Sequence, residues 1–424
     1  MSGRLDWRKT PPLAVAGVVA AALLAVVFHP IVRDGLEIIP DGLKYLIDAE
    51  NLNRGLGLSL GCAPAVYPDT HWAPGYSVLL ALVLRLGLPW HAAAAVIALL
   101  CYAVLSMGSF ALAYRVTRSV PAALATQLVI GMNPVLLHWG ASMQSEPLSW
   151  LCVLAAVALL HGLLTKGGAG RALALGVVLG AGMLVRFASG GVLLGAAAAI
   201  VLLSPRDEWK SALRKVVLVC APAVAMTGAW LVRNRLVSGD VVPAAFGAAG
   251  VSWQTVGAIV LDWWHVVGVT TVPARAGLLI VVPLAGFAIL AGVAWRSWRR
   301  RDGSGREAAL LYLIALIMAA GYCVGMFLVH SFVTVITLDS RMFSPVVLLI
   351  WLALPAAVSA LEWRYRNAAR GLTAVCACAV IVMGLVEMNV LRGTADPTYA
   401  IWKDGKWMEF RVDENLTSHC QLGP

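Results

Sequence analysis

Long apolar runs alternate with short polar segments along most of the chain. Because a membrane-spanning helix needs about 20 mainly apolar residues, these runs predict roughly eleven transmembrane helices. Their approximate limits are 11–30, 91–113, 121–138, 147–164, 172–187, 189–204, 215–232, 276–295, 308–329, 343–361 and 371–391. The run 75–88 is too short to span comfortably and predicts an interfacial or re-entrant helix. The pattern therefore predicts an all-α polytopic membrane protein.

A long polar segment, residues 31–90, separates the first two predicted spans and contains an amphipathic pattern. Five residues recur there at spacings of three and four, which places them on one helix face: Asp41, Lys44, Tyr45, Asp48 and Leu52. Pro40 marks the start of this helix and the Gly55 and Gly57 pair marks its end. We expect the helix to lie at the membrane surface, with Asp41 in the first turn, where the helix dipole favours an ionised carboxylate. The alternative is a solvated acidic face with a helix-stabilising aspartate.

Composition and charge agree with a membrane protein and indicate its orientation. Hydrophobic residues make up 60% of the chain and charged residues 13%, against about 25% charged in soluble domains. With the N-terminus inside, most Lys and Arg residues fall on cytoplasmic segments and most acids on outer ones. The net charge of +10 therefore reflects topology rather than nucleic-acid binding. The Ala- and Gly-rich composition with short loops favours a bacterial plasma membrane, and the chemistry is expected on its extracytoplasmic face.

The domain organisation is expected to be simple. Residues 1–395 form one transmembrane domain that includes the outer loop 31–90, and residues 396–424 form a short extracytoplasmic tail. A second long outer segment covers about 233–275. Cys62 and Cys420 are the cysteines placed outside the apolar spans, so they are candidates for one disulfide, and two free or separately buried thiols are the alternative.

The opening loop contains the most specific motif of the chain, which reads D-G-x-x-Y-x-x-x-A-x-x-L-x-x-G-x-G-x-S from Asp41 and is followed by HWAPGYSVLLAL from His71. Shorter motifs follow later in the chain: NPVLLHWGASMQSEPL, VRFASG, WLVRNRLVSGD and LDSRMFSPVVLL. Together they resemble, from about residue 12 to residue 350, the motifs of polytopic glycosyltransferases of the GT-C fold, a superfamily that includes protein O-mannosyltransferases and aminoarabinose transferases of lipid A. The resemblance implies a sugar donor on a polyprenyl phosphate and a catalytic carboxylate that matches Asp41. Several relatives carry Asp-Glu at this place, whereas Gly42 follows here, so the role of a second acid is not carried over.

The residues themselves support the same chemistry. Inverting transfer needs a base that takes the proton of the acceptor hydroxyl, and an ionised Asp41 fits this role. Cations at the lipid–water boundary would stabilise the leaving phosphate, and the candidates are Arg186, Arg233 and Arg341. For Arg233 the alternative is snorkelling to the interface, and for Arg341 it is an ion pair with Asp339.

Further candidates would line the substrate pocket. Glu146 is either a second carboxylate that faces Asp41 or the N-terminal acid of the fourth predicted span. His71, Trp72 and Tyr76 could contact the sugar, since aromatic rings stack on sugars, and membrane anchoring is the alternative for Trp72. Tyr45 and Asp48 share the helix face of Asp41 and belong to the predicted substrate-binding residues, and Asp339, beside Arg341, completes that set.

The sequence contains no HExxH, GxSxG or Gly-rich phosphate-binding motif, and its eight His residues lack metal-ligand spacing. No cofactor is required, although a divalent metal that bridges donor phosphate and carboxylate is compatible with the sequence. We therefore predict a transferase that moves a hexosyl or pentosyl group from a polyprenyl-phosphate donor, with undecaprenyl phosphate as the expected carrier. The acceptor is a cell-envelope lipid, glycan or protein, and nucleic acid is not a partner. The alternative is a polytopic lipid or sugar transporter or flippase, which would be expected to show internal repeats or interrupted helices.

Overall fold

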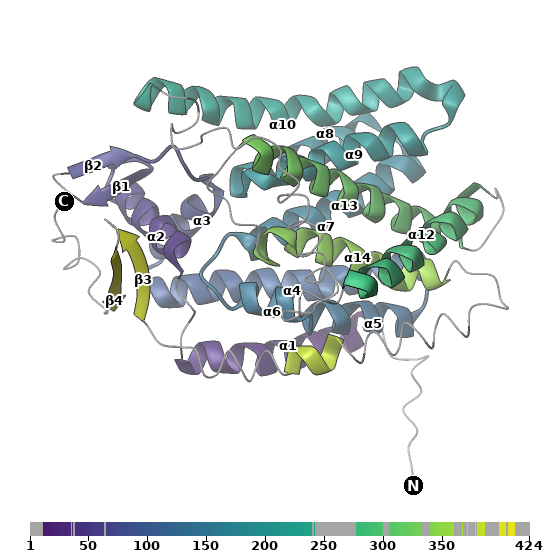
Figure 1. The fold of residues 1–424 in the computed structure, drawn as a ribbon, viewed down its shortest axis with the longest axis horizontal. Coiled ribbons are helices and arrows are strands. Elements are labelled where there is room, and N and C mark those ends of the chain that lie inside the picture. Colours follow the sequence, from purple (N-terminus) through teal and green to yellow (C-terminus); the bar gives the residue numbers. More distant parts are fainter. Residues whose placement is uncertain are drawn as a thin grey trace, which may run out of the picture.

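The computed structural model is a bundle of long helices that lie roughly side by side (Figure 1). It describes residues 12–239 with gaps at 35, 37–38 and 63–64, residue 241, residues 277–299, 305–332 and 340–359, single positions and a short stretch between 367 and 385, and residues 398–403 and 406–411. The predicted fold class, a helical polytopic membrane protein, is confirmed.

The described part of the chain is mainly helical. They are α1 (Pro12–Asp34), α2 (Pro40–Asn53), α3 (Gly75–Leu84), α4 (Trp90–Thr117), α5 (Val120–Gly131), α6 (Pro134–Gly140), α7 (Glu146–Lys166), α8 (Ala169–Val185), α9 (Gly190–Leu203), α10 (Trp209–Ser238), α12 (Gly277–Arg299), α13 (Arg306–Phe332) and α14 (Ser340–Ser359). Two 3-10 turns cover Phe187–Ser189 and Arg206–Glu208. Two antiparallel hairpins are formed by β1 (Ser59–Cys62) with β2 (Ala65–Pro68) and by β3 (Thr398–Lys403) with β4 (Lys406–Arg411).

Several helices in the described part of the chain are suited to a membrane. Four are long and apolar enough to cross it: Trp90–Thr117, Glu146–Lys166, Arg206–Ser238 and Arg306–Val329. The bent pair of α5 and α6 would add a fifth, and shorter apolar helices include α3, α8 and α9. Predicted span 371–391 lies mostly outside the described residues, as does the second outer segment from residue 242 onward.

The structure divides the predicted span 121–138 into two helices that meet at an angle of 53°. Asn133 caps α6, because its side-chain Oδ1 accepts from the backbone N–H groups of Val135 (3.1 Å) and Leu136 (3.3 Å). Pro134 follows as the first helical residue, where its missing N–H costs nothing. The predicted span 121–138 is therefore bent, since this asparagine–proline pair starts a second helix within it.

Glycines allow close contact between the helices that carry the later part of the bundle. A Cβ at Gly191 of α9 would lie 2.7 Å from the Cα of Tyr322 in α13, and one at Gly180 of α8 would lie 2.9 Å from the Cα of Ala223 in α10. Such contacts bring backbones together where apolar burial gains little against lipid. They hold α9 against α13 and α8 against α10.

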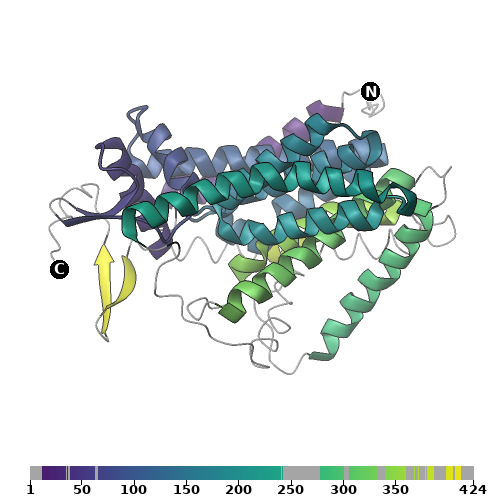
Figure 2. The same cartoon turned by 90° about the horizontal axis from the view of Figure 1, so that it is seen from above.

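One end of the bundle carries α2, α3 and the β1–β2 hairpin, which gather there in both views (Figures 1 and 2). Asn51 joins α2 to the hairpin by donating to the carbonyls of Ser59 (2.9 Å) and Gly61 (3.0 Å). Asn53 joins α2 to α3 by donating to the carbonyl of Ala81 (3.0 Å). The loop predicted from the opening polar segment is therefore an ordered cap on this end of the bundle.

Candidate active site

The helix that carries Asp41 forms as predicted. α2 begins at Pro40, a residue that suits the first helical position, and Asp41 lies in the first turn, where the helix dipole favours its charge. The chain turns away after Asn53, and Gly55 has a φ of +81°, a backbone conformation that favours glycine. The predicted helix is confirmed, and it points its N-terminal turn at the ends of α7 and α14.

Two further helix ends supply an acid and a base next to this turn. Glu146 is the first residue of α7 and only 1% of its side chain is exposed. Arg186 follows α8 in an extended backbone conformation, with φ −157° and ψ 117°, and its side chain is 13% exposed. Its guanidinium donates to Oε1 of Glu146. The turn at Phe187–Ser189 thus places Arg186 between α8 and α9, where the sequence shows a charge inside apolar surroundings.

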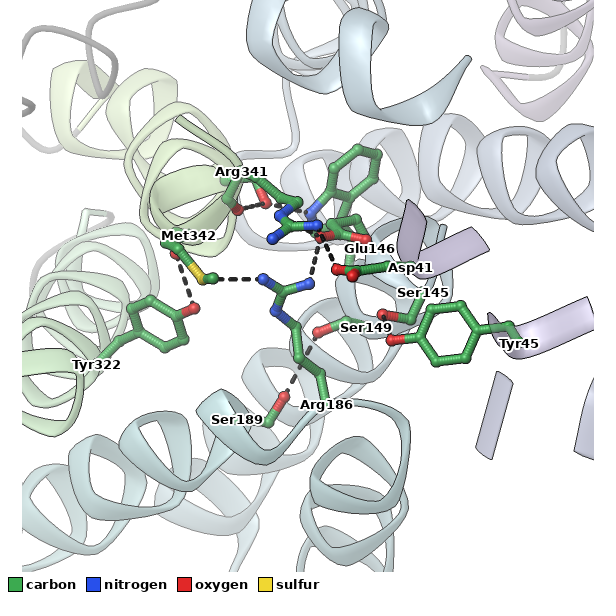
Figure 3. A network of polar contacts seen from close by, with 12 residues as sticks. Asp41, Tyr45, Ser145, Glu146, Ser149, Arg186, Ser189, Tyr322, Arg341 and Met342 are labelled. Carbon is green, nitrogen blue, oxygen red and sulfur yellow. Dashed lines mark hydrogen bonds and ion pairs between the residues drawn. The ribbon is translucent and has the colours of Figure 1, made fainter. Parts of the chain in front are cut away.

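Arg341 of α14 completes a network of four charges (Figure 3). Its Nη1 lies 2.6 Å from Oδ2 of Asp41, and its Nε lies 3.5 Å from Oε1 of Glu146. The side chains of Arg341 and Asp41 are 15% and 16% exposed, so both are partly accessible to solvent. The guanidinium also lies 5.7 Å from the ring centre of Trp139, within reach of a cation–π contact. Two acids and two arginines from four helix ends therefore meet in one place.

Neighbouring polar groups hold this network in position. Arg186 also donates to the sulfur of Met342 (2.9 Å), whose backbone carbonyl accepts from the Tyr322 hydroxyl (2.7 Å), as Figure 3 shows. The indole N–H of Trp150 donates to the Ser344 hydroxyl (2.9 Å), which in turn donates to the carbonyl of Arg341 (2.8 Å). These contacts connect α7, α13 and α14. They restrict the backbones from which the arginines project.

Aromatic residues of the predicted set lie together beside the network. The Tyr45 ring meets the rings of Trp72 and Tyr76 edge to face, with centres 6.0 Å and 5.2 Å apart, and its hydroxyl lies 3.3 Å from that of Ser145. His71 lies against Trp72, with ring centres 4.8 Å apart. Burial, helped by the charge of nearby Lys44, lowers the pKa of His71. The structure thus brings His71, Trp72, Tyr45 and Tyr76 into one cluster.

Lys44 is a neighbour that the prediction of substrate-binding residues omitted. Its ammonium lies 4.7 Å from the centre of the Trp72 ring, one helical turn beyond Asp41. The spacing of three residues from Asp41 was the sequence signal that could have added it to the site.

Asp48 lies deeper along α2, in a contact separate from the charged network. Its carboxyl accepts from the Ser77 hydroxyl of α3 (3.4 Å), and both Asp48 and Asp69 are 2% exposed. Burial, followed by the closeness of Asp69, raises the pKa of Asp48 well above its usual range. Asp69 accepts from the backbone N–H groups of His71 (2.8 Å) and Trp72 (3.4 Å). This arrangement secures the segment that carries the aromatic cluster.

Arg233 and Asn234, near the end of α10, contact the backbone of the opening loop. The Arg233 guanidinium donates to the carbonyls of Leu58 (2.9 Å) and Asp69, and it stacks on Trp230, 4.6 Å from the ring centre. Asn234 donates to the carbonyl of Thr70 (3.1 Å). The structure therefore places Arg233 at the loop, away from the pair of Arg186 and Arg341.

Two predictions fall on residues that the structure does not describe: the role of Asp339 beside Arg341, and the disulfide between Cys62 and Cys420. Asp339 and Cys420 lie outside the described residues, and the side chain of Cys62 does too. In the part of the chain that is described, no group of three or more His, Cys, Asp or Glu side chains gathers as a metal site.

Gly42, next to Asp41, lies in a contact that leaves no room for a side chain. A Cβ built at this position would collide with the backbone carbonyl of Met143, in the connection between α6 and α7. Only glycine fits this contact without movement of α2. The second acid that faces Asp41 comes from α7, as Glu146.

The fold and the site together define a multi-pass membrane protein with a charge-balanced polar site at one end of its helix bundle. The family model described as dolichyl-phosphate-mannose-protein mannosyltransferase matches residues 71–231. No curated protein matches the chain in sequence. The matched family is one of transferases that use a lipid-phosphate sugar, which is the class of enzyme that the sequence predicts.

Solved structures share the fold at low sequence identity. ArnT from Cupriavidus metallidurans bound to undecaprenyl phosphate has a TM-score of 0.57 and 15% identity, over 90% of this chain and 73% of that chain. The apo state of the same protein has a TM-score of 0.55 and 15% identity, over 90% and 76% of the two chains. The arabinosyltransferase EmbB from Mycobacterium smegmatis has a TM-score of 0.42 and 13% identity, over 93% of this chain and 42% of that one. The ArnT matches confirm the resemblance to the GT-C fold.

Proposed function

We propose that this protein transfers a sugar from a polyprenyl-phosphate donor to an acceptor hydroxyl, with inversion at the anomeric carbon and with Asp41 as the base. One observation carries the proposal: the carboxylate of Asp41 and the guanidinium groups of Arg186 and Arg341 meet at the partly exposed end of a membrane bundle. A base for the acceptor and cations for the phosphate are the two requirements of this reaction.

The reaction follows from these groups. The acceptor oxygen forms a bond to the anomeric carbon while the bond between that carbon and the phosphate oxygen breaks, and its electron pair stays on the phosphate. Asp41 takes the acceptor proton. Arg186 and Arg341 lie where they can donate to the phosphate as its charge grows, and charge-assisted hydrogen bonds of this kind are about twice as strong as neutral ones. Within the aromatic cluster, the half-buried rings of His71 and Trp72 remain available to the sugar, whereas Tyr45 and Tyr76 are buried behind them.

The polyprenyl carrier is supported by the comparisons. The matched family is named for dolichyl-phosphate-mannose, and the similar ArnT structure holds undecaprenyl phosphate. We extend this chemistry to the present chain and assign it a lipid, glycan or protein acceptor of the cell envelope.

The site is assigned to the extracytoplasmic face. α4, α7 and α12 finish at the end of the bundle opposite Asp41, while α10 and α13 begin there. In the described chain this opposite end combines many basic residues with few acids, whereas the end with Asp41 carries most of the acids beside its own Lys and Arg residues; the basic residues at the opposite end are Arg115, Arg118, Lys166, Arg171, Arg206, Lys210, Arg214, Lys215, Arg296, Arg299 and Arg306, and the acids there are Asp207, Glu208 and Glu307. Because Lys and Arg are enriched on cytoplasmic segments, the end with Asp41 faces outward.

A reconstituted transfer assay tests the proposal. Purified protein in liposomes is given undecaprenyl phosphate that carries radiolabelled mannose, arabinose or aminoarabinose, together with envelope extract as acceptor. We expect Asp41→Asn to lower the transfer rate by about 100-fold or more, because it removes the base and keeps the size. Glu50→Gln is the matched control, since Glu50 lies on the same helix and pairs with the exposed Arg54.

Two results would count against the proposal. One is an Asp41→Asn rate within about threefold of wild type in normally folded protein. The other is movement of the lipid-linked sugar between leaflets without any transfer, which would favour a flippase.

A further inference from the structure

We propose that Arg341 couples the two halves of the reaction: it binds ionised Asp41 before transfer and moves to the leaving phosphate when Asp41 takes up the acceptor proton. This inference rests on the proposed function. It assigns different tasks to the two arginines of the site.

The position of Arg341 allows such a movement. Its Nη1 contacts Asp41, whose carboxylate is partly exposed, while its Nε faces the buried Glu146 at 3.5 Å. The carbonyl of Arg341 is held by the Ser344 hydroxyl, which also accepts from Trp150. Because the backbone is fixed and the side chain is long, the guanidinium can exchange Asp41 for the phosphate while it keeps its contact with Glu146.

Arg186, in contrast, keeps the same partners throughout the proposed reaction. Its guanidinium donates to Glu146 and to the sulfur of Met342, and Met342 is held in turn by the Tyr322 hydroxyl. Glu146 is nearly fully buried and takes no proton in the proposed reaction, so its attraction for Arg186 does not change during transfer. Arg186 therefore remains a fixed cation, whereas the partner of Arg341 changes charge.

The charges of the reaction give the direction of the movement. Asp41, Glu146, Arg186 and Arg341 sum to zero formal charge. The donor phosphodiester brings one negative charge. When the bond to the anomeric carbon breaks, the phosphate becomes a monoester with about −1.5 to −2 charge at pH 7. At the same step the acceptor proton neutralises Asp41. The attraction that holds Arg341 thus falls at Asp41 and rises at the phosphate.

Binding of undecaprenyl phosphate, the expected product, tests the coupling without turnover. Asp41→Asn imitates protonated Asp41 and should release Arg341 to the ligand. We expect this variant to bind undecaprenyl phosphate about tenfold more tightly than wild type, the equivalent of one charge-assisted hydrogen bond. Glu50→Gln removes a charge from the same helix outside the network and should leave the affinity unchanged.

A double-mutant cycle separates the coupling from a simple loss of repulsion between Asp41 and the phosphate. In an Arg341→Gln background, the Asp41→Asn change should alter the affinity for undecaprenyl phosphate by less than about twofold, because the guanidinium that would move to the phosphate is absent. Arg341→Lys serves as a second background that keeps the charge, and there part of the gain should return. Thermal unfolding of each variant in detergent checks that it is folded.

The outcomes distinguish the inference from the proposed function. A tenfold gain that persists in the Arg341→Gln background overturns the coupling, because repulsion alone then explains it. An Asp41→Asn affinity equal to or weaker than that of wild type also overturns it, while wild-type binding and sugar transfer leave the proposed function standing. Wild-type protein that neither binds undecaprenyl phosphate nor transfers sugar overturns both.

Discussion

Glu146 offers the sharpest test of the charged network, because it is the buried acid on which both arginines depend. Its Oε1 accepts from Arg186 and lies 3.5 Å from Nε of Arg341. Glu146→Leu keeps a similar volume and removes the charge and both acceptor oxygens. Glu146→Gln removes the charge and keeps one acceptor.

The structure sets the size of the expected effect. Loss of one partner from a buried ion pair costs about 3 to 5 kcal/mol, because an uncompensated charge remains. Arg186 and Arg341 reach some water, so we expect Glu146→Leu to lower the free energy of unfolding by about 3 kcal/mol, the low end of this range. Glu146→Gln retains a hydrogen bond and should cost about 1.5 to 3 kcal/mol.

Unfolding of the purified variants in mixed micelles, with and without undecaprenyl phosphate, measures this effect. A ligand at 100 times its dissociation constant adds about 2.7 kcal/mol to the stability of a protein that binds it only when folded. Because the phosphate replaces the missing carboxylate, the same ligand concentration should stabilise Glu146→Leu by more than it stabilises wild type. Glu50→Leu, which removes an acid from an exposed pair, should respond to the ligand as wild type does.

A stability loss below about 1 kcal/mol for Glu146→Leu would show that the arginines find other partners, and that the network is not held by this acid. An equal or smaller effect of the ligand on the variant would separate Glu146 from the phosphate site. Either result would refute the reasoning above.

Two further predictions concern the opening loop. The raised pKa of Asp48 means that the folded protein keeps a proton that the unfolded chain loses above about pH 4, so the free energy of unfolding should fall as the pH rises above that value. Asp48→Asn should flatten this dependence in unfolding titrations between about pH 5 and 8. An unchanged pH dependence in the variant would contradict this. Gly42→Ala should push α2 away from Met143, which should lower the free energy of unfolding by about 1 to 3 kcal/mol and reduce sugar transfer. Gly17→Ala is the control and should be tolerated, because a Cβ there meets no atom within 4 Å. Equal melting temperatures for the two variants would show that α2 adapts to the added methyl group.

The sequence predicted the local features of the site well. The helix from Pro40 and the place of Asp41 in its first turn follow from residue spacing and from the preference of proline for helix starts. The prediction that Glu146 faces Asp41 across the site agrees with the structure, where Arg341 lies between them. Its alternative, an N-terminal acid of α7, is also met, because one residue serves both purposes.

Contacts between distant segments could not be predicted in the same way. The alternative ion pair predicted for Arg341 was with Asp339, two residues away and outside the described residues, whereas its described partners, Asp41 and Glu146, come from distant segments. The hydrogen bond from Trp150 to Ser344 and that from Tyr322 to Met342 join different helices, and no periodicity along one helix contains such information. Asn133 and Pro134 are a helix-start signal that could have predicted the bend between α5 and α6, but the apolar residues around them favoured one uninterrupted span.

The distance along the chain between the two ends of the Asp41–Arg341 contact has a consequence for biogenesis. These residues are separated by 300 positions. At a synthesis rate of about 5 to 20 residues per second, α2 emerges roughly 15 to 60 seconds before α14. During that interval the carboxylate on α2 has no arginine from α14, and the later helices must insert before the opening loop can settle. A ribosome that stalls between α13 and α14 would leave a chain with most of its membrane helices and no assembled charged network, so shortened chains should be recognisable to quality-control proteases by a loose, cleavable opening loop.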